Sequence, residues 1–294
     1  KFDEYQLAKY NRDGAVKLRD ALFLCHAKPK DKEQEALWKR LVDGKLATPD
    51  TWEVQLSGGA DKRLTFETLM NGNMLGGLAW LRNLRGMHEA GVTAAAILAY
   101  ADKVNVSRVL PFRFLAAARH APMFEPAIEK AMFRSFEGRA KFEGKTVVLI
   151  DVSGSMKDPV SGKSEISRLD AACGVAIVLR ELCDDVHVFI FSNGVRQIPA
   201  RRGFALRDAV GRAGGGTELG AAVRAMNGYG YDRLVVITDE QSADRVPDPV
   251  GTKGYMLNVA VNRNGVGYGK WMHIDGWSEA CMDYIRQLED AGER

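Results

Sequence analysis

Oxygen-bearing side chains follow directly after a short apolar run in the middle of the chain. Residues 146–150 are all apolar or β-branched, and they lead into Asp151, Ser153 and Ser155 on a glycine-containing loop. A continuous apolar run bounded by glycine is typical of a strand buried on both faces of a parallel sheet. Carboxylate and hydroxyl oxygens suit hard divalent cations such as Mg²⁺. The sequence therefore predicts a cation-binding loop at the carboxyl end of a buried strand, where open α/β sheets bind ligands.

Two later stretches add the same kinds of ligand. Thr217 follows three glycines just before a helical pattern, and Asp239 closes a second apolar run at residues 233–238. A strand-end aspartate alone is often only a helix cap, and glycine-rich or serine-rich loops are usually turns. Three separated pieces that agree in residue type, order and strand context favour one joint metal site over three coincidences.

This set resembles the metal-ion-dependent adhesion site of von Willebrand factor A (vWA) domains. That site combines an Asp-x-Ser-x-Ser loop, a loop threonine and a strand-end aspartate. The matching residues here are Asp151, Ser153, Ser155, Thr217 and Asp239. The resemblance implies a divalent metal ion as cofactor, Mg²⁺ in the first place. It also implies one open coordination position, which a carboxylate or phosphate oxygen of a partner fills.

The elements that must position these residues are strands and helices in alternation. Strands are expected at residues 186–191, 234–237 and 255–261, and helices at residues 168–182, 219–226 and 278–288. Such alternation predicts a parallel sheet covered by helices on both faces. We therefore expect an α/β doubly wound (Rossmann-like) vWA domain over residues 143–294.

The first half of the chain has helical periodicity and almost no strand signal. Apolar residues at helical spacing predict helices over residues 32–46, 65–84 and 90–101, among others. Short helices joined by tight turns suggest an α-helical repeat (HEAT-like) segment, although no fixed sequence period is visible. With room for about two domains, we expect a boundary between residues 1–142 and 143–294.

Several stretches of the helical half resemble the TROVE module of Ro ribonucleoproteins, in which a vWA domain follows the helical repeats. These stretches are residues 9–14, 19–22, 26–29, 75–84 and 110–115. The resemblance implies a noncatalytic RNA-binding protein that takes small noncoding Y-like RNAs and single-stranded RNA ends. Its expected role is RNA quality control or processing. The family's module is about twice as long as residues 1–142, so we expect either a carboxy-terminal portion or a naturally short member.

Cations near the amino terminus are candidate RNA contacts. Lysine and arginine neutralise phosphates and release counterions, and His26 can stack on or hydrogen-bond an unpaired base. The candidates are Lys9, Arg12, Lys17, Arg19, His26, Lys28, Lys30 and, from a later apolar helix, Arg113. The resemblance assigns family Y RNA contacts to Lys9, His26 and, after a one-residue shift, Arg12. The alternative is a solvated charged face, because acids such as Asp20 and Asp31 interleave with these cations.

Composition limits the remaining possibilities. The net charge is +3, but residues 1–142 hold 23 Lys and Arg against 17 Asp and Glu, whereas residues 143–294 hold 18 against 21. Four scattered cysteines without close spacing argue against a disulfide scaffold or a zinc site and favour a reducing compartment. No apolar run reaches the length of a membrane span and no signal peptide is visible, so we expect a cytoplasmic protein without membrane contact.

Enzyme interpretations are weaker. Residues 162–164 read Gly-Lys-Ser, but Lys157 stands where a phosphate-binding loop requires its first glycine. Neither Ser153 nor Ser155 is followed by the lysine of a Ser-x-x-Lys motif. A metal-dependent phosphatase or nuclease lacks an obvious general base. The main alternative is a metal-dependent protein-interaction module, in which the vWA site binds an RNA-processing nuclease or another acidic protein and the helical half is a scaffold.

Overall fold

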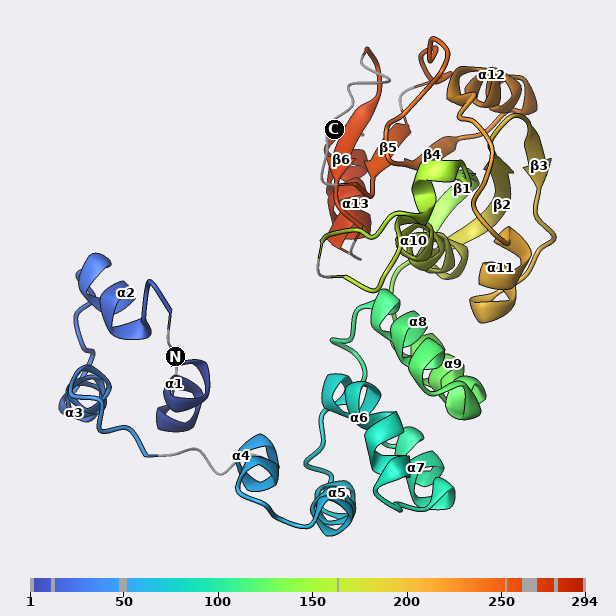
Figure 1. Ribbon diagram of the computed structural model, residues 1–294. Helices are drawn as coiled ribbons and strands as arrows, with labels where there is room; N and C mark the ends of the chain where they lie inside the picture. The colour runs from blue at the N-terminus through green and yellow to red at the C-terminus, as the bar shows by residue number, and fades with distance from the viewer. Residues whose placement is uncertain are drawn as a thin grey trace. The chain divides into compact units, whose positions relative to one another are not determined.

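The computed structural model divides into two compact units, residues 1–72 and residues 73–294 (Figure 1). The residues it describes are 3–11, 14–47, 52–162, 164–251, 253–260, 269–277 and 280–292. None of the helices within these ranges is long and apolar enough to cross a membrane.

The first unit is built of short helices. They are α1 (Glu4–Tyr10), α2 (Leu18–Leu24), α3 (Lys32–Val42), α4 (Trp52–Ser57) and α5 (Lys62–Asn71). Aspartates begin three of them: the carboxylates of Asp3, Asp31 and Asp61 each accept a hydrogen bond from the amide three residues ahead. Such caps satisfy amides that have no partner within the helix. The guanidinium of Arg40 donates two hydrogen bonds to the carboxylate of Glu4, which joins α3 to α1.

The second unit starts with five further helical elements. They are α6 (Gly77–Glu89), α7 (Ala94–Ala101), α8 (Pro111–His120), the 3₁₀ turn η1 (Pro122–Phe124) and α9 (Glu125–Arg134). The helix expected over residues 65–84 is wrong, because α5 ends at Asn71 and α6 begins at Gly77. Asn73 between them has a positive φ of 55°, which a continuous helix does not allow.

A six-stranded sheet forms the centre of the second unit, in the order β3-β2-β1-β4-β5-β6. The strands are β1 (Phe142–Asp151), β2 (Cys183–Phe191), β3 (Val195–Gln197), β4 (Arg233–Thr238), β5 (Gly254–Asn258) and β6 (Met272–Asp275). All neighbouring pairs are parallel except β2 and β3. β1 from Thr146 onward and the whole of β4 are buried, as their apolar runs predict.

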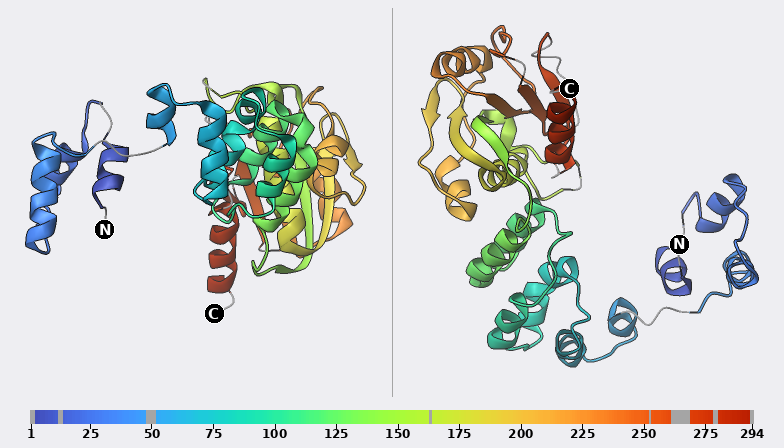
Figure 2. Two further views of the ribbon diagram at one scale, coloured as in Figure 1. Left: turned by 90° about the horizontal axis from the view of Figure 1, so that it is seen from below. Right: turned by 180° about the vertical axis from the view of Figure 1, so that it is seen from behind.

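Helices lie around this sheet as a doubly wound fold requires (Figures 1 and 2). They are α10 (Arg168–Leu182), α11 (Gly203–Val210), α12 (Leu219–Tyr229) and α13 (Ala280–Gly292). The predicted fold class, a helical segment followed by a Rossmann-like α/β domain, is confirmed. The strand β6 was not predicted, because its four residues do not form an apolar run.

The helices α6 to α9 belong to the same compact unit as the sheet. α8 packs on α10, where a Cβ on Gly174 would lie 3.4 Å from a methyl carbon of Leu115. Arg119 on α8 donates to the carboxylate of Asp170 on α10, so an ion pair joins the two helices. Secondary structure changes from helix to strand at Phe142, where the domain boundary was predicted, but the division into functional domains at that point stays a prediction.

Candidate metal site

Two neighbouring central strands bring the candidate acids to one edge of the sheet. β1 and β4 are parallel with Ile150 opposite Ile237, so Asp151 and Asp239 follow at the same carboxyl edge. The hydroxyl of Thr238 donates to a carboxylate oxygen of Asp151 at 2.7 Å, which ties the two strand ends together. Both aspartates are fully buried.

Backbone hydrogen bonds hold the three candidate loops against one another. The amide of Gly214 donates to the carbonyl of Val152 at 2.7 Å, and the amide of Gly154 donates to the carbonyl of Gly215 at 3.1 Å. The carbonyl of Thr217 accepts from the amide of Ala243 at 2.8 Å, beyond the Asp239 loop. The glycine loop therefore contacts the loops that follow both β1 and β4, and the five predicted ligands belong to one assembly of loops.

The Asp151 carboxylate is held in a fixed orientation. One of its oxygens accepts from the amide of Ser153 at 2.8 Å, and the hydroxyls of Ser153 and Ser155 are 3.3 Å apart. Burial raises the pKa of Asp151 to about 6, and the charge of Asp239 acts in the same direction against the opposing hydrogen bonds from Ser153 and Thr238. A buried pair of acids of this kind favours a nearby cation.

An arginine side chain already contacts one of the candidate metal ligands. Arg168 begins α10, and one of its terminal nitrogens donates to the Asp239 carboxylate at 2.8 Å and to the carbonyl of Ser155 at 3.2 Å. The same nitrogen lies 3.5 Å from the carboxylate of Asp158. The Arg168 side chain is only 11% exposed. Within the described part of the chain its Nε is buried and has no hydrogen-bond partner.

The sequence analysis did not identify Arg168 as a residue of this site. A signal for it exists, because a positive charge in the first turn of a helix opposes the helix dipole. Arg168 directly follows the N-cap Ser167, so it needs a compensating acid elsewhere in the fold. Nothing in the local sequence says that this acid is Asp239, 71 residues further on.

The donor set fits a hard divalent ion. Two carboxylates and three hydroxyls offer only oxygen, which is the ligand type that Mg²⁺ prefers. In the described ranges no group of three or more His, Cys, Asp or Glu side chains could hold a metal ion. A metal at this edge would therefore depend on the hydroxyls of Ser153, Ser155 and Thr217 as well as on the two acids.

The candidate RNA contacts divide between the two units. Lys17, Arg19, His26, Lys28 and Lys30 lie on α2 and in the segments flanking it, in the first unit. Arg12 and the side chain of Lys9 lie outside the described residues. Two of the cations have acidic neighbours in the sequence: Arg19 is 3.6 Å from Asp20, and Lys30 is 3.6 Å from Asp31.

Two of these candidates have distinctive surroundings. His26 is exposed and has a positive φ of 46° just after α2, so the chain turns sharply there. Arg113 belongs to the second unit, where it is exposed and its guanidinium lies 4.7 Å from the ring centroid of Phe112.

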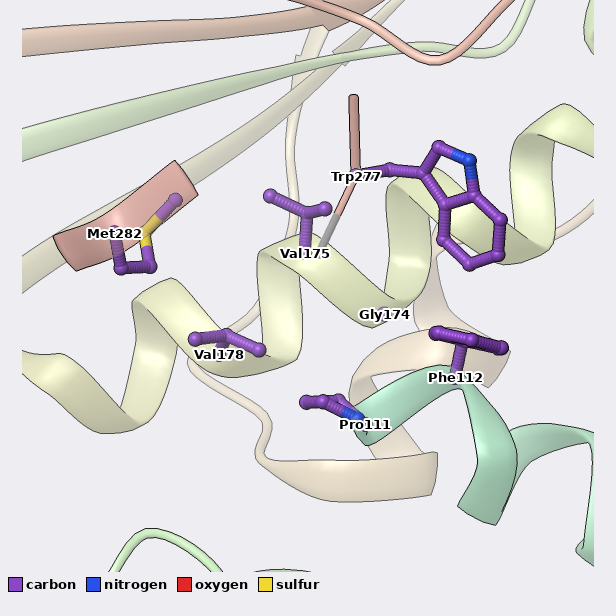
Figure 3. Close-up of a pocket in the computed structure, with 7 residues that line it drawn as sticks. All are labelled: Pro111, Phe112, Gly174, Val175, Val178, Trp277 and Met282. Carbon is purple, nitrogen blue, oxygen red and sulfur yellow. The ribbon is translucent and has the colours of Figure 1, made fainter. Parts of the chain in front are cut away.

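A small apolar cavity lies between α8, α10 and α13, and Figure 3 shows its lining. Phe112, Val178, Trp277 and Met282 contribute side chains, and the Phe112 and Trp277 rings pack edge to face. Its volume of about 10 Å³ has room for about one water molecule. The cavity is therefore a packing defect between helices and not a ligand site.

The comparisons with known proteins agree with the helical resemblance. Residues 35–135 match the family model of the TROVE domain. About a third of the chain is therefore similar to a TROVE domain. The TROVE match covers part of α3 and all of α4 to α9, so it spans the boundary between the two compact units.

A solved structure resembles nearly the whole chain. It is the crystal structure of the Deinococcus radiodurans RO (RSR) protein, with a TM-score of 0.65 and 18% sequence identity. The match covers 97% of this chain and 73% of that chain. At this identity the likeness establishes a shared fold, a helical segment followed by an α/β domain. No curated protein matches the chain.

Proposed function

We propose that the chain is a noncatalytic RNA-binding protein of the Ro type. The observation that carries this proposal is the combination, in one chain, of a TROVE domain and the fold of the Deinococcus RO (RSR) protein. The RNAs we propose are small noncoding Y-like RNAs and the single-stranded ends of structured or misfolded RNAs. The biological role would then be RNA quality control or processing.

The surface around α2 supports RNA binding through its chemistry. No described side chain of α2 is buried, and Phe23 and Leu24 are 59% and 74% exposed. Tyr10, at the end of α1, is 54% exposed. Aromatic rings beside cations suit single-stranded nucleic acid, since bases stack on the rings while lysine and arginine neutralise the phosphates.

The second part of the proposal concerns the carboxyl edge of the sheet. The residues that would hold a divalent ion, Mg²⁺ by its preference for oxygen ligands, are Asp151, Ser153, Ser155, Thr217 and Asp239. The ion would supply an open coordination position for a carboxylate or phosphate of a partner, such as an RNA-processing nuclease. Because both acids serve as ligands, neither is free to act as a general base, which supports a docking role over hydrolysis.

The RNA test is a gel-shift titration of the whole chain with a stem-loop RNA that carries an unpaired end, at several salt concentrations. One variant removes four cations beside α2, and a control removes four exposed lysines elsewhere in the same unit. The variant is K17Q/R19Q/K28Q/K30Q and the control is K32Q/K39Q/K45Q/K62Q. Four lost phosphate contacts lower the slope of log affinity against log salt by about 3 for single-stranded RNA. Equal slopes for the two variants would refute the claim that the surface around α2 contacts RNA. No binding by the wild-type chain would refute the proposal that the protein binds RNA.

The metal test is independent of RNA. Saturating Mg²⁺ should raise the melting temperature of the wild-type chain, and Asp239→Ala should abolish that rise because it removes a buried ligand. Binding at one hundred times the dissociation constant stabilises by about 2.7 kcal/mol. A wild-type chain that shows no Mg²⁺-dependent shift and no heat of binding would remove the metal proposal. If RNA binding persists in EDTA, the metal is not needed for RNA binding and would serve the binding of another partner.

A further inference from the structure

One segment of the α/β domain differs in charge from all that surrounds it. Residues 193–217 hold five arginines and a single acid, Asp208, which is a net charge of +4. The rest of residues 143–294 holds 13 Lys and Arg against 20 Asp and Glu, a net charge of −7. The positive charge of the domain is therefore concentrated in about one sixth of its length.

This segment lies at one edge of the sheet. It contains the edge strand β3 and the helix α11, which Figures 1 and 2 show at the same side of the domain. The amide of Gly216 donates to the side-chain oxygen of Asn193 at 2.8 Å, so the end of the segment returns to the turn before β3. Arg196, on β3, and Arg212, after α11, are thus brought to one edge although 16 residues separate them.

Two of the five arginines are neutralised and three are not. Arg202 pairs with Glu181, and Arg207 lies 2.8 Å from Asp208. The other three are exposed and make no ion pair or side-chain hydrogen bond with any described residue. They are Arg196, Arg201 and Arg212.

Protection of the sheet edge explains only part of this arrangement. Charged side chains on an edge strand prevent pairing with other chains, and this accounts for Arg196 opposite Ile190. Arg201 and Arg212 lie outside β3 and protect no strand. Three unpaired charges of one sign that repel one another favour a surface that binds a polyanion.

We propose that Arg196, Arg201 and Arg212 form a second RNA-binding surface, which contacts the phosphate backbone without reading sequence. The proposal rests on the proposed RNA-binding function and adds the α/β domain to it. Guanidinium groups suit phosphate because their planar donors form paired hydrogen bonds with it. The one aromatic ring of the segment, Phe204, is 3% exposed, so no base stacks there and recognition is of the backbone. Arg212 is five residues from Thr217 in the sequence, so the segment that carries these arginines runs into the proposed metal loop.

The test compares two triple variants of the whole chain that lose equal charge. R196Q/R201Q/R212Q removes the surface, and K157Q/R245Q/K270Q removes three exposed cations elsewhere in the α/β domain that form no ion pair with any described residue. Circular dichroism confirms that both are folded. The probe is an unstructured uridine oligomer, titrated across a tenfold range of salt. Three lost contacts lower the salt slope by about 2, which is about a 100-fold loss of affinity at the low end of that range.

Each outcome either supports or overturns the proposal that these three arginines bind RNA. A reduced slope for R196Q/R201Q/R212Q, with the control unchanged, supports the surface. Equal binding by the two triple variants overturns it, while RNA binding by the wild-type chain keeps the proposed function. A parallel titration with polyglutamate tests whether the surface binds an acidic protein instead. The RNA-binding proposal is also overturned if R196Q/R201Q/R212Q loses polyglutamate binding but keeps RNA binding. If the wild-type chain binds no RNA, the proposed function and this surface are both refuted.

Discussion

Replacing Arg168 by methionine should change both the stability of the second unit and its response to metal. Methionine keeps much of the side-chain length and removes the charge. Asp239 is fully buried, and Arg168 lies 2.8 Å from one of its oxygens. Without this guanidinium, the buried carboxylate of Asp239 loses its ion pair with Arg168, next to the second buried acid, Asp151.

The size of the effect follows from these contacts. Removal of one partner of a buried ion pair costs about 3–5 kcal/mol, and we expect the lower end because Arg168 retains 11% exposure. For a unit of about 200 residues, roughly 3 kcal/mol lowers the melting temperature by about 6–12 °C. The affinity for a divalent ion should rise at the same time, since the fixed charge no longer repels it. Two unit charges 4 Å apart interact by about 4 kcal/mol at an effective dielectric constant of about 20. If the loss of Arg168 removes a third of such a repulsion, the affinity for the metal ion rises about tenfold.

Melting curves in EDTA and along a Mg²⁺ titration, with calorimetric binding in parallel, measure both quantities. Arg168→Met should melt lower than wild type in EDTA and bind Mg²⁺ more tightly, so that Mg²⁺ recovers much of the lost stability. Arg168→Lys keeps the charge and should remain closer to wild type in both respects. A methionine variant as stable as wild type in EDTA would refute the ion-pair argument. A variant that binds Mg²⁺ no more tightly than wild type would refute the competition between Arg168 and the metal.

Two further predictions concern packing and pH. A Cβ on Gly77 would lie 2.5 Å from the carbonyl oxygen of Asn105, so Gly77→Ala should cost about 1–3 kcal/mol in urea unfolding, whereas Gly76→Ala, with open space around it, should be nearly neutral. Burial alone would raise the pKa of Glu289, but hydrogen bonds from Arg233 and its neighbours outweigh burial and hold this pKa below the ordinary 4.5. The stabilisation by Glu289 is therefore complete above pH 4.5 and is lost as pH falls through the lower folded-state pKa. Glu289→Gln should lower stability at neutral pH and flatten the fall of stability in acid; an acid limb identical to that of wild type would refute this assignment.

The sequence was informative wherever burial dictates residue type. β1 and β4 are apolar because both faces are covered, so their ends, and with them Asp151 and Asp239, could be placed at one edge. Prediction from the sequence failed where a single backbone conformation or pairing with another strand determines the local structure. The break at Asn73 depends on a single backbone conformation, and β6 is specified by its pairing with β5.

Arg168 illustrates the same limit within the candidate site itself. Residue types and spacing predicted the acids and hydroxyls as metal ligands, and this assignment stays a prediction. The guanidinium that opposes Asp239 belongs to the start of α10, and only the packing of α10 against the strand ends brings it there. A sequence pattern can therefore predict candidate metal ligands without predicting an arginine that pairs with one of them.

The placement of α8 determines which form of the protein can test these proposals. A chain cut between residues 142 and 143, at the change from helix to strand, would remove α8 from α10. Phe112 and Leu115 are 8% and 5% exposed, and burial of such side chains contributes about 1.5–3 kcal/mol each. The cut would also remove the ion pair between Arg119 and Asp170, and Asp170 belongs to the capping box of the helix that carries Arg168. A loss of metal binding in an isolated α/β domain would then reflect displacement of α10 and not the absence of RNA, so the metal and RNA experiments require the whole chain.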